Sequence, residues 1–181
     1  MFLSGTVAAA MRLFFALMPD DALRIALASL GRELAQRIGG RAVPAHNVHL
    51  TLAFLGEVEE ARVPPLRTML DALPRAAFAL TLDRVGEWHH AGVAWIAPSV
   101  VPPALVALHA RLDEALAAER YPVEARPFRP HVTLVRRRSR MLPERATTPL
   151  EWSVRRLALV RSESVDGAVR YREDAGVALV A

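Results

Sequence analysis

Two short segments of the chain each carry a histidine and a threonine separated by one apolar residue. The first is His49-Leu50-Thr51-Leu52 and the second is His131-Val132-Thr133-Leu134. Successive side chains of a β-strand point to opposite faces, so each histidine shares a face with its threonine while the apolar residues face a core. One copy is typical of a half-exposed strand. The second copy favours a paired site.

Two imidazoles on neighbouring strands can serve as a general acid and a general base, because the ordinary pKa of histidine lies near 6.5. The threonine hydroxyls can donate hydrogen bonds to phosphate oxygens. The pattern therefore predicts a site for phosphoester chemistry built from four residues: His49, Thr51, His131 and Thr133.

The two motifs resemble those of the 2H phosphoesterase superfamily, in particular its RNA 2′,3′-cyclic phosphodiesterases, also called 2′-5′ RNA ligases. The similarity runs from Arg12-Leu13-Phe14-Phe15 to Tyr171, and Arg136 follows the second motif as in that family. The resemblance implies an α+β fold with two pseudo-symmetric lobes. Their antiparallel β-sheets and flanking helices would surround a central cleft.

The resemblance also implies a role for each motif residue. His49 would be the proton donor and His131 the proton acceptor in opening a 2′,3′-cyclic phosphate to a 2′-phosphate. Thr51 and Thr133 would hold the non-bridging oxygens. Arg136 would contact the phosphate side of the substrate, and its alternative is a solvated arginine in a basic loop.

Two aromatic residues raise separate questions. Phe14 could stack on a base of the substrate, although packing in the core is the commoner use of such a residue. Trp88 stands where the family more often has phenylalanine, and we expect it not to touch the chemistry.

The sequence predicts no metal site and no cofactor. It contains no cysteine, and its acidic residues form no cluster with ligand spacing. His46 and His49 are three residues apart, which places them on opposite faces of a strand, and His109 falls near the apolar face of a predicted helix.

The resemblance implies RNA as the partner, and the arginine-rich segment could follow an RNA backbone or could simply be surface. All 23 basic residues are arginines. The segment from Arg120 to Arg145 contains eight arginines and only two acidic residues, Glu124 and Glu144. Two other functions stay open. One is ATP-independent 2′-5′ RNA ligation, which is the same chemistry in reverse, and the other is RNA binding without catalysis. We expect a monomer.

Hydrophobic periodicity predicts alternating strands and helices. Strands are expected at residues 13–17, 48–55, 78–85, 91–97, 128–135, 151–160 and 169–180, with helices opening near 19–21, 64 and 102. Residues 136–149 are expected to form a loop, Asp166-Gly167 a hairpin turn and Gly176 a β-bulge.

The chain also contains an internal repeat. The motif histidines are 131 − 49 = 82 residues apart, and the helical leucines before them share that offset, as Leu23 with Leu105 and Leu30 with Leu112. We therefore expect residues 11–181 to form a single bilobal domain with an internal duplication. Residues 1–10 are expected to be a leader outside the fold, and the protein is expected in the cytoplasm without membrane contact.

Overall fold

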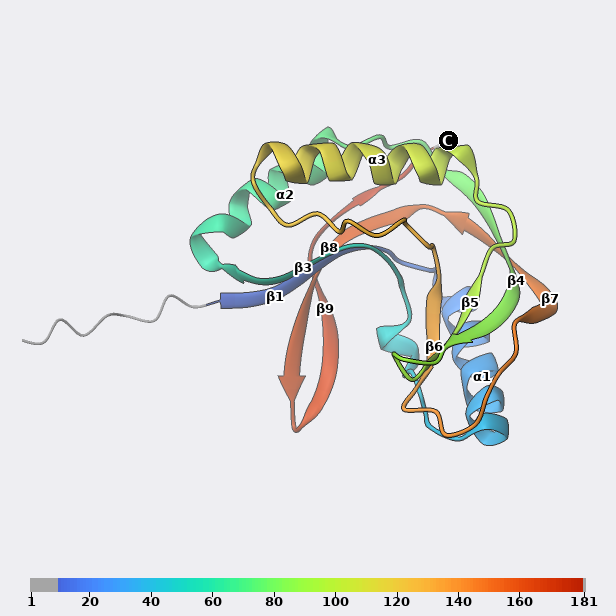
Figure 1. Cartoon of the computed structure of the whole chain (residues 1–181). Coiled ribbons are helices and arrows are strands. Elements are labelled where there is room, and N and C mark those ends of the chain that lie inside the picture. The colour runs from blue at the N-terminus through green and yellow to red at the C-terminus, as the bar shows by residue number, and fades with distance from the viewer. Residues whose placement is uncertain (1–9, 181) are drawn as a thin grey trace, which may run out of the picture.

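The computed structural model describes residues 10–180, so nearly all of the stretch expected to be a leader lies outside the described residues. Its elements are β1 (Ala10–Leu17), α1 (Asp21–Ile38), β2 (Arg41–Ala42), η1 (Ala45–Asn47), β3 (Leu50–Glu59), η2 (Glu60–Arg62), α2 (Val63–Ala72), β4 (Phe78–Trp88), β5 (Val93–Ala97), α3 (Pro103–Ala118), β6 (Val132–Arg136), β7 (Arg145–Val154), β8 (Arg156–Val165) and β9 (Ala168–Ala178). Figure 1 shows their arrangement. Among these residues, no helix is long and apolar enough to cross a membrane.

The three α-helices begin within one residue of the positions that the sequence predicts. The carboxylate of Asp20 accepts a hydrogen bond of 2.8 Å from the backbone N–H of Leu23, which caps the first turn of α1. Gly39 follows the last residue of α1 with φ of 73°, a conformation that favours glycine. Each helix turns a row of apolar residues into the core, and in α3 these are Leu105, Leu108, Leu112 and Leu116.

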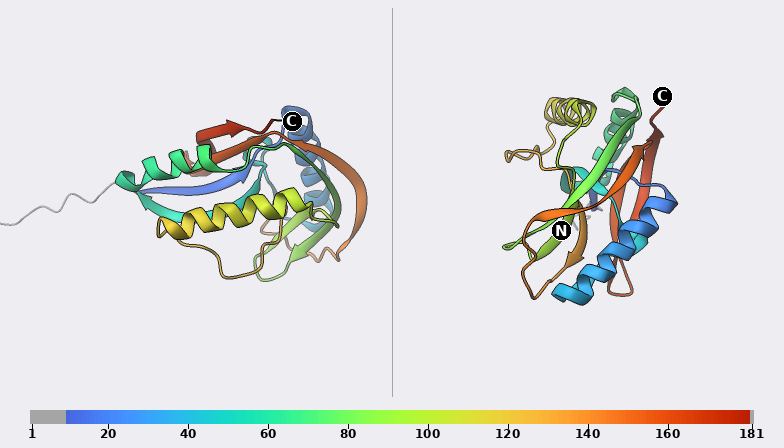
Figure 2. Two further views of the ribbon diagram at one scale, coloured as in Figure 1. Left: turned by 90° about the horizontal axis from the view of Figure 1, so that it is seen from above. Right: turned by 90° about the vertical axis from the view of Figure 1, so that its right-hand side faces the viewer.

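The described strands form one antiparallel sheet instead of two separate ones. Its order is β7-β4-β5-β6-β3-β1-β8-β9, with β2 beside β6. Between the two halves, β3 and β6 form a single backbone pair, Leu50 with Val132, and β2 adds two pairs with β6 beside it. Figure 2 shows how strongly the sheet curves, with α1 on one side and α3 on the other.

The helices pack crosswise on the two central strands. α1 follows β1 in the chain but lies against β6, and α3 follows β5 but lies against β3. The close approach of α1 is made at Gly31, where an added Cβ would lie 3.0 Å from the carbonyl oxygen of Leu134. Each half therefore covers the motif strand of the other.

Three local predictions are wrong. The expected strand at 151–160 is two strands, because β7 pairs with β4 while β8 pairs with β1 at the other side of the sheet. In β7 only Trp152 and Val154 are buried, at alternate positions, whereas the four residues from Leu157 to Val160 are all buried, and this change of pattern marks the break. β7 also begins at Arg145, inside the expected loop. Its first half is exposed and shows no apolar alternation, so the sequence does not indicate a strand there.

The third error concerns the bulge in β9. Gly176 pairs in register with Ala158, and the extra residue is Asp174. The bulge directs the Asp174 carboxylate to two guanidinium groups, with bonds of 2.7 Å from Arg67 and 2.8 Å from Arg161. The turn before β9 is as predicted, because Asp166 and Gly167 both have positive φ, as a type I′ turn requires.

Candidate active site

His49 lies immediately before β3 and two residues after the end of the short helix η1. Its Nδ1 is 2.7 Å from the carbonyl oxygen of Asn47, and its Nε2 is 3.0 Å from Oγ1 of Thr51. A carbonyl can only accept, so Nδ1 carries a proton and the neutral ring leaves Nε2 free to exchange one. The predicted sharing of a face by His49 and Thr51 is confirmed.

The side chain of Asn47 ties this segment to β9. It is buried, with an exposed fraction of 6%. Its Nδ2 donates to the carbonyl of Val169 at 2.8 Å, and its Oδ1 accepts from the backbone N–H of Tyr171 at 2.9 Å. The sequence gives no signal for these bonds, because the partners lie more than 120 residues away. Asn47 thus fixes both the carbonyl that holds His49 and the strand that covers it.

Two aromatic rings enclose the imidazole of His49. Its centroid is 4.8 Å from that of Phe14 and 5.0 Å from that of Tyr171, and the Tyr171 ring stands edge-on to it. Phe14 lines the cavity described below, but its exposed fraction is 3%. Its ring is therefore already covered by His49 and Tyr171, as expected for core packing.

His131 lies before β6 in an arrangement that parallels His49. Its Nδ1 is 2.8 Å from the carbonyl oxygen of Arg129, again two residues earlier, so its Nε2 is also the free nitrogen. The ring meets Trp88 edge-on at a centroid distance of 4.2 Å. Our expectation that Trp88 does not touch the site is therefore wrong. Thr133 pairs across the sheet with Trp95, whose ring lies 5.8 Å from that of Trp88.

The protein environment favours neutral rings at both positions. Burial lowers the pKa of His49 from 6.5 to about 4; the bond to the Asn47 carbonyl opposes this shift, and the positive charge of Arg136, with that of His131 when it is protonated, adds to it. Burial likewise lowers the pKa of His131, the Arg129 carbonyl opposes the shift, and Arg136 lowers the pKa further. In the free protein both imidazoles are therefore uncharged at neutral pH.

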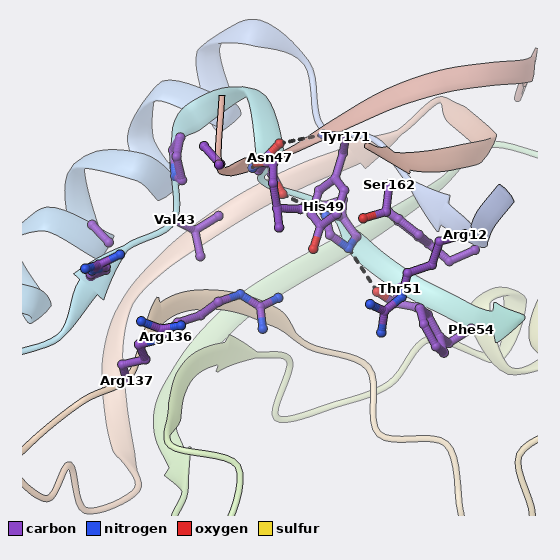
Figure 3. A pocket seen from close by; sticks show the side chains of 17 residues that line it. Arg12, Val43, Asn47, His49, Thr51, Phe54, Arg136, Arg137, Ser162 and Tyr171 are labelled. Carbon is purple, nitrogen blue, oxygen red and sulfur yellow. Dashed lines mark hydrogen bonds between the residues drawn. The ribbon is translucent and has the colours of Figure 1, made fainter. Parts of the chain in front are cut away.

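A cavity of about 630 Å³ opens beside His49, between β3, β6 and the tip of the β8–β9 hairpin (Figure 3). His49 and Thr51 line it, whereas His131 and Thr133 are not among its lining residues. Four arginines contribute to its wall: Arg12, Arg41, Arg136 and Arg137. None of its described lining residues is acidic, so the cavity suits an anionic ligand.

The arginines after the second motif separate into two groups. Arg136 and Arg137 line the cavity. Arg138 is instead buried against Glu87, with 2.6 Å between Nε and the carboxylate, and Arg140 donates to the backbone carbonyl of Arg37. Arg138 and Arg140 therefore hold the loop in place, and only the first two can meet a ligand in the cavity.

Phe54 is a cavity residue that the sequence does not reveal. Its ring is half exposed and lines the cavity close to Thr51 (Figure 3). Strict alternation would place Phe54 on the core side with Leu50 and Leu52. A bulge at Leu52, where β3 loses register with β1, moves Phe54 to the face of Thr51 instead.

The described part of the chain contains no group of three or more histidine, cysteine, aspartate or glutamate side chains that could hold a metal ion. His109 stacks on Phe128 at a centroid distance of 3.8 Å, as its predicted packing role requires. His89 meets the guanidinium group of Arg138 at 3.1 Å.

The fold and both motifs can be compared with known proteins. Residues 19–166 match the family model of the 2′-5′ RNA ligase superfamily. This chain belongs to that superfamily. Two curated relatives named RNA 2′,3′-cyclic phosphodiesterase are each 36% identical to it. The Escherichia coli protein matches over 73% of this chain and 76% of its own length, and the Thermus thermophilus protein over 84% and 82%.

Solved structures of similar proteins agree with the fold. The crystal structure of Escherichia coli LigT complexed with 3′-AMP has a TM-score of 0.86 at 31% identity and covers 96% of this chain and 100% of that chain. The structure of TT0787 of Thermus thermophilus has a TM-score of 0.78 at 30% identity, with coverage of 93% and 98%. The α+β fold expected from the sequence is confirmed.

Proposed function

We propose that the protein hydrolyses RNA 2′,3′-cyclic phosphate ends to 2′-phosphates, with His49 as general acid and His131 as general base. One observation carries the choice of this pair for proton transfer, and the division into acid and base follows from the family resemblance. Both imidazoles donate Nδ1–H to a carbonyl two residues earlier, so both leave Nε2 for proton transfer. The relatives named RNA 2′,3′-cyclic phosphodiesterase support the choice of reaction.

The proposed steps balance without a metal ion. Nε2 of His131 takes a proton from water as the water oxygen bonds to phosphorus. The bond from phosphorus to O3′ breaks, and Nε2–H of His49 delivers a proton to O3′. Thr51 and Thr133 donate to the non-bridging oxygens, and Arg136 offsets their negative charge.

The low pKa of His49 gives substrate binding a second role in this scheme. A ring with a pKa of about 4 carries no proton on Nε2 at neutral pH and cannot act as the acid. A bound phosphodiester brings a negative charge beside the ring, which raises its pKa. Binding of the substrate should therefore be accompanied by uptake of a proton at His49.

The same site can run in reverse as an ATP-independent 2′-5′ RNA ligase, and the superfamily carries that name. Hydrolysis is favoured because water is far more concentrated than a second RNA end. The proposal further places the enzyme in the cytoplasm as a monomer acting on RNA, and light scattering on the purified protein would test the oligomeric state.

The test is turnover of a short oligoribonucleotide ending in a 2′,3′-cyclic phosphate, measured in the presence of EDTA. We expect one product, and a ligase that distinguishes 2′- from 3′-phosphate ends should identify it as the 2′-phosphate. A 3′-phosphate would reverse the proposed substrate orientation. Activity that disappears with EDTA and returns with one divalent cation would refute the metal-independent mechanism.

A further inference from the structure

Three arginines lie next to one another where β2 runs beside the end of β6. Arg41 of β2 pairs directly with Arg136 of β6, and Arg137 follows Arg136 in the chain. All three residues are exposed, all three line the cavity, and none forms an ion pair with another described residue. Like charges that stand opposite each other on neighbouring strands repel, so this arrangement lowers the stability of the free protein.

The backbone around these arginines is also constrained. Arg137 has a φ of 53°, a left-handed conformation that is uncommon for a residue with a side chain. Gly40 lets β2 approach the same segment closely, since an added Cβ there would lie 2.7 Å from the carbonyl oxygen of Arg136. A hydrogen bond of 2.8 Å from the backbone N–H of Arg140 to the carbonyl of Ile38 fixes the residues that follow. Repulsion and backbone strain gathered at one place favour a bound anion there.

The proposed reaction accounts for only one of the three arginines. The charge of Arg136 lowers the pKa of both catalytic histidines, so its guanidinium group lies close to the reacting phosphate. Arg41 and Arg137 have no role in that scheme. The residues that follow Arg41 along the cavity wall are uncharged, namely Ala42, Val43 and Pro44. A cavity of about 630 Å³ holds more than one phosphate group, so its β2 side has both room and charge for a second anion.

We infer that Arg41 and Arg137 form a second phosphate subsite, which binds an RNA phosphodiester next to the reacting phosphate. The inference rests on the proposed function, which places the reacting phosphate at His49. Neighbouring antiparallel strands lie about 5 Å apart, so the long side chain of Arg41 can reach a phosphate beyond the one that Arg136 contacts. Arginine suits this use because its planar guanidinium group donates two parallel hydrogen bonds to phosphate oxygens.

The first experiment removes the charge of this phosphodiester. Two dinucleotides begin with a 2′-deoxynucleotide and end in a 2′,3′-cyclic phosphate, and they differ only in their linkage, a phosphodiester in one and an uncharged methylphosphonate in the other. In kcat/KM we expect the wild type to prefer the charged dinucleotide roughly 10- to 100-fold, the range for hydrogen bonds to a charged group. Arg41→Gln and Arg137→Gln should each reduce this preference, and together they should abolish it.

Arg12→Gln is the matched control. Arg12 lines the same cavity and forms no ion pair with another described residue. Figure 3 shows it beside Ser162 and away from Arg137. The control variant removes one positive charge from the cavity without touching the subsite, so it should keep the preference for the charged linkage. An equal loss of preference in Arg12→Gln and Arg41→Gln would mean that only the total charge of the cavity matters, and would overturn the subsite.

The phosphodiester can belong to the substrate strand itself or to a second RNA end held for ligation, and a second experiment separates these sources. Adenosine 2′,3′-cyclic phosphate has no phosphodiester beside its reacting phosphate, and a deoxydinucleotide with a free 5′-OH is added to it. If the second end occupies the subsite, the charged dinucleotide should inhibit hydrolysis more than its methylphosphonate counterpart, and Arg41→Gln should remove the difference. If the substrate strand occupies it, only the first experiment should show a preference. No preference of the wild type in either experiment would refute the subsite.

Failure of the proposed function would look different, since the wild type would then turn over no substrate. Calorimetric titration decides the subsite in that case, with dinucleotides that end in a 2′-phosphate and with the added deoxydinucleotide in the presence of adenosine 2′-phosphate. In one of these titrations the phosphodiester form should bind the wild type more tightly than the methylphosphonate form, and the difference should shrink in Arg41→Gln. Equal affinity for the two forms in both titrations would overturn the inference.

Discussion

Leu50 of β3 pairs with Val132 of β6, and the two residues stand 132 − 50 = 82 positions apart, which is the offset of the internal repeat. Equivalent residues that pair with each other lie on a local twofold axis. The residues before them, His49 and His131, are therefore brought to the two sides of that axis. We propose on this basis that residues 11–181 are a single bilobal domain derived from a duplicated unit.

Loss of either histidine should abolish most turnover. We expect His49→Ala and His131→Ala each to lower kcat by about 10²–10⁴-fold, because each removes one proton-transfer group. His90→Ala, which removes an exposed histidine that does not line the cavity, should have no effect. Steady-state kinetics checks the three variants. A near-wild-type kcat in either of the first two would assign that histidine a structural role.

Arg136 should contribute both to binding and to the acidity of the histidines. Arg136→Ala should raise KM. It should reduce the slope of log binding constant against log salt concentration by about 1, the value for one lost phosphate contact. It should also raise the pKa of His49 and of His131, since the charge of Arg136 lowers both. Arg111→Ala, an exposed arginine of α3, makes the same change in net charge as a control. An unchanged salt slope together with unchanged histidine pKa values would mean that Arg136 is only solvated.

The pH dependence of kcat/KM should be bell-shaped, because one ring must be protonated and the other neutral. The two apparent pKa values belong to the coupled pair and not to single residues. NMR titration of His49 should show its pKa rising from about 4 when a phosphate ligand is added. A His49 pKa that is the same with and without the ligand would contradict the proposed proton uptake.

Stability should fall in acid because of His49. Its pKa is 6.5 in its ordinary state and about 4 in the fold, so the unfolded chain binds more protons between these values. The free energy of unfolding should therefore decrease as pH falls from 6.5 towards 4. Urea unfolding of His49→Gln should show a weaker decrease over the same range. If the free energy of unfolding fell equally with pH in the wild type and in His49→Gln, the titrating group would be a residue other than His49.

Asn47 should matter for both stability and catalysis. Asn47→Ala removes two buried hydrogen bonds to β9 and should lower the free energy of unfolding by about 1–3 kcal/mol. It should also lower kcat, because the carbonyl that orients His49 loses its anchor. Asn47→Asp keeps the acceptor for the Tyr171 N–H but places a charged, buried carboxylate oxygen against the Val169 carbonyl. At neutral pH it should therefore be at least as destabilising as Asn47→Ala, and the same unfolding and kinetic measurements test this order.

The sequence predicts the parts of the site that depend on local alternation. His49 and Thr51 share a face as their spacing requires, and the apolar residues between and after them are buried. It does not predict Phe54, because the bulge at Leu52 changes the phase of β3 between Thr51 and Phe54. Nor does it predict the contacts of Asn47 and Tyr171, which depend on β9 returning beside η1 from the far end of the chain.

The crosswise packing of α1 on β6 and of α3 on β3 bears on how such a chain could have arisen. A half-length polypeptide with only β1, α1 and β3 would leave the apolar face of its helix uncovered. Two copies would cover each other's helices and pair their motif strands at the position now held by Leu50 and Val132. A homodimer with one histidine from each subunit would thus already contain both imidazoles. Gene fusion would then have allowed the two halves to diverge. Asn47, whose side chain bonds to β9, stands in the first half, and the matching position in the second half is Arg129.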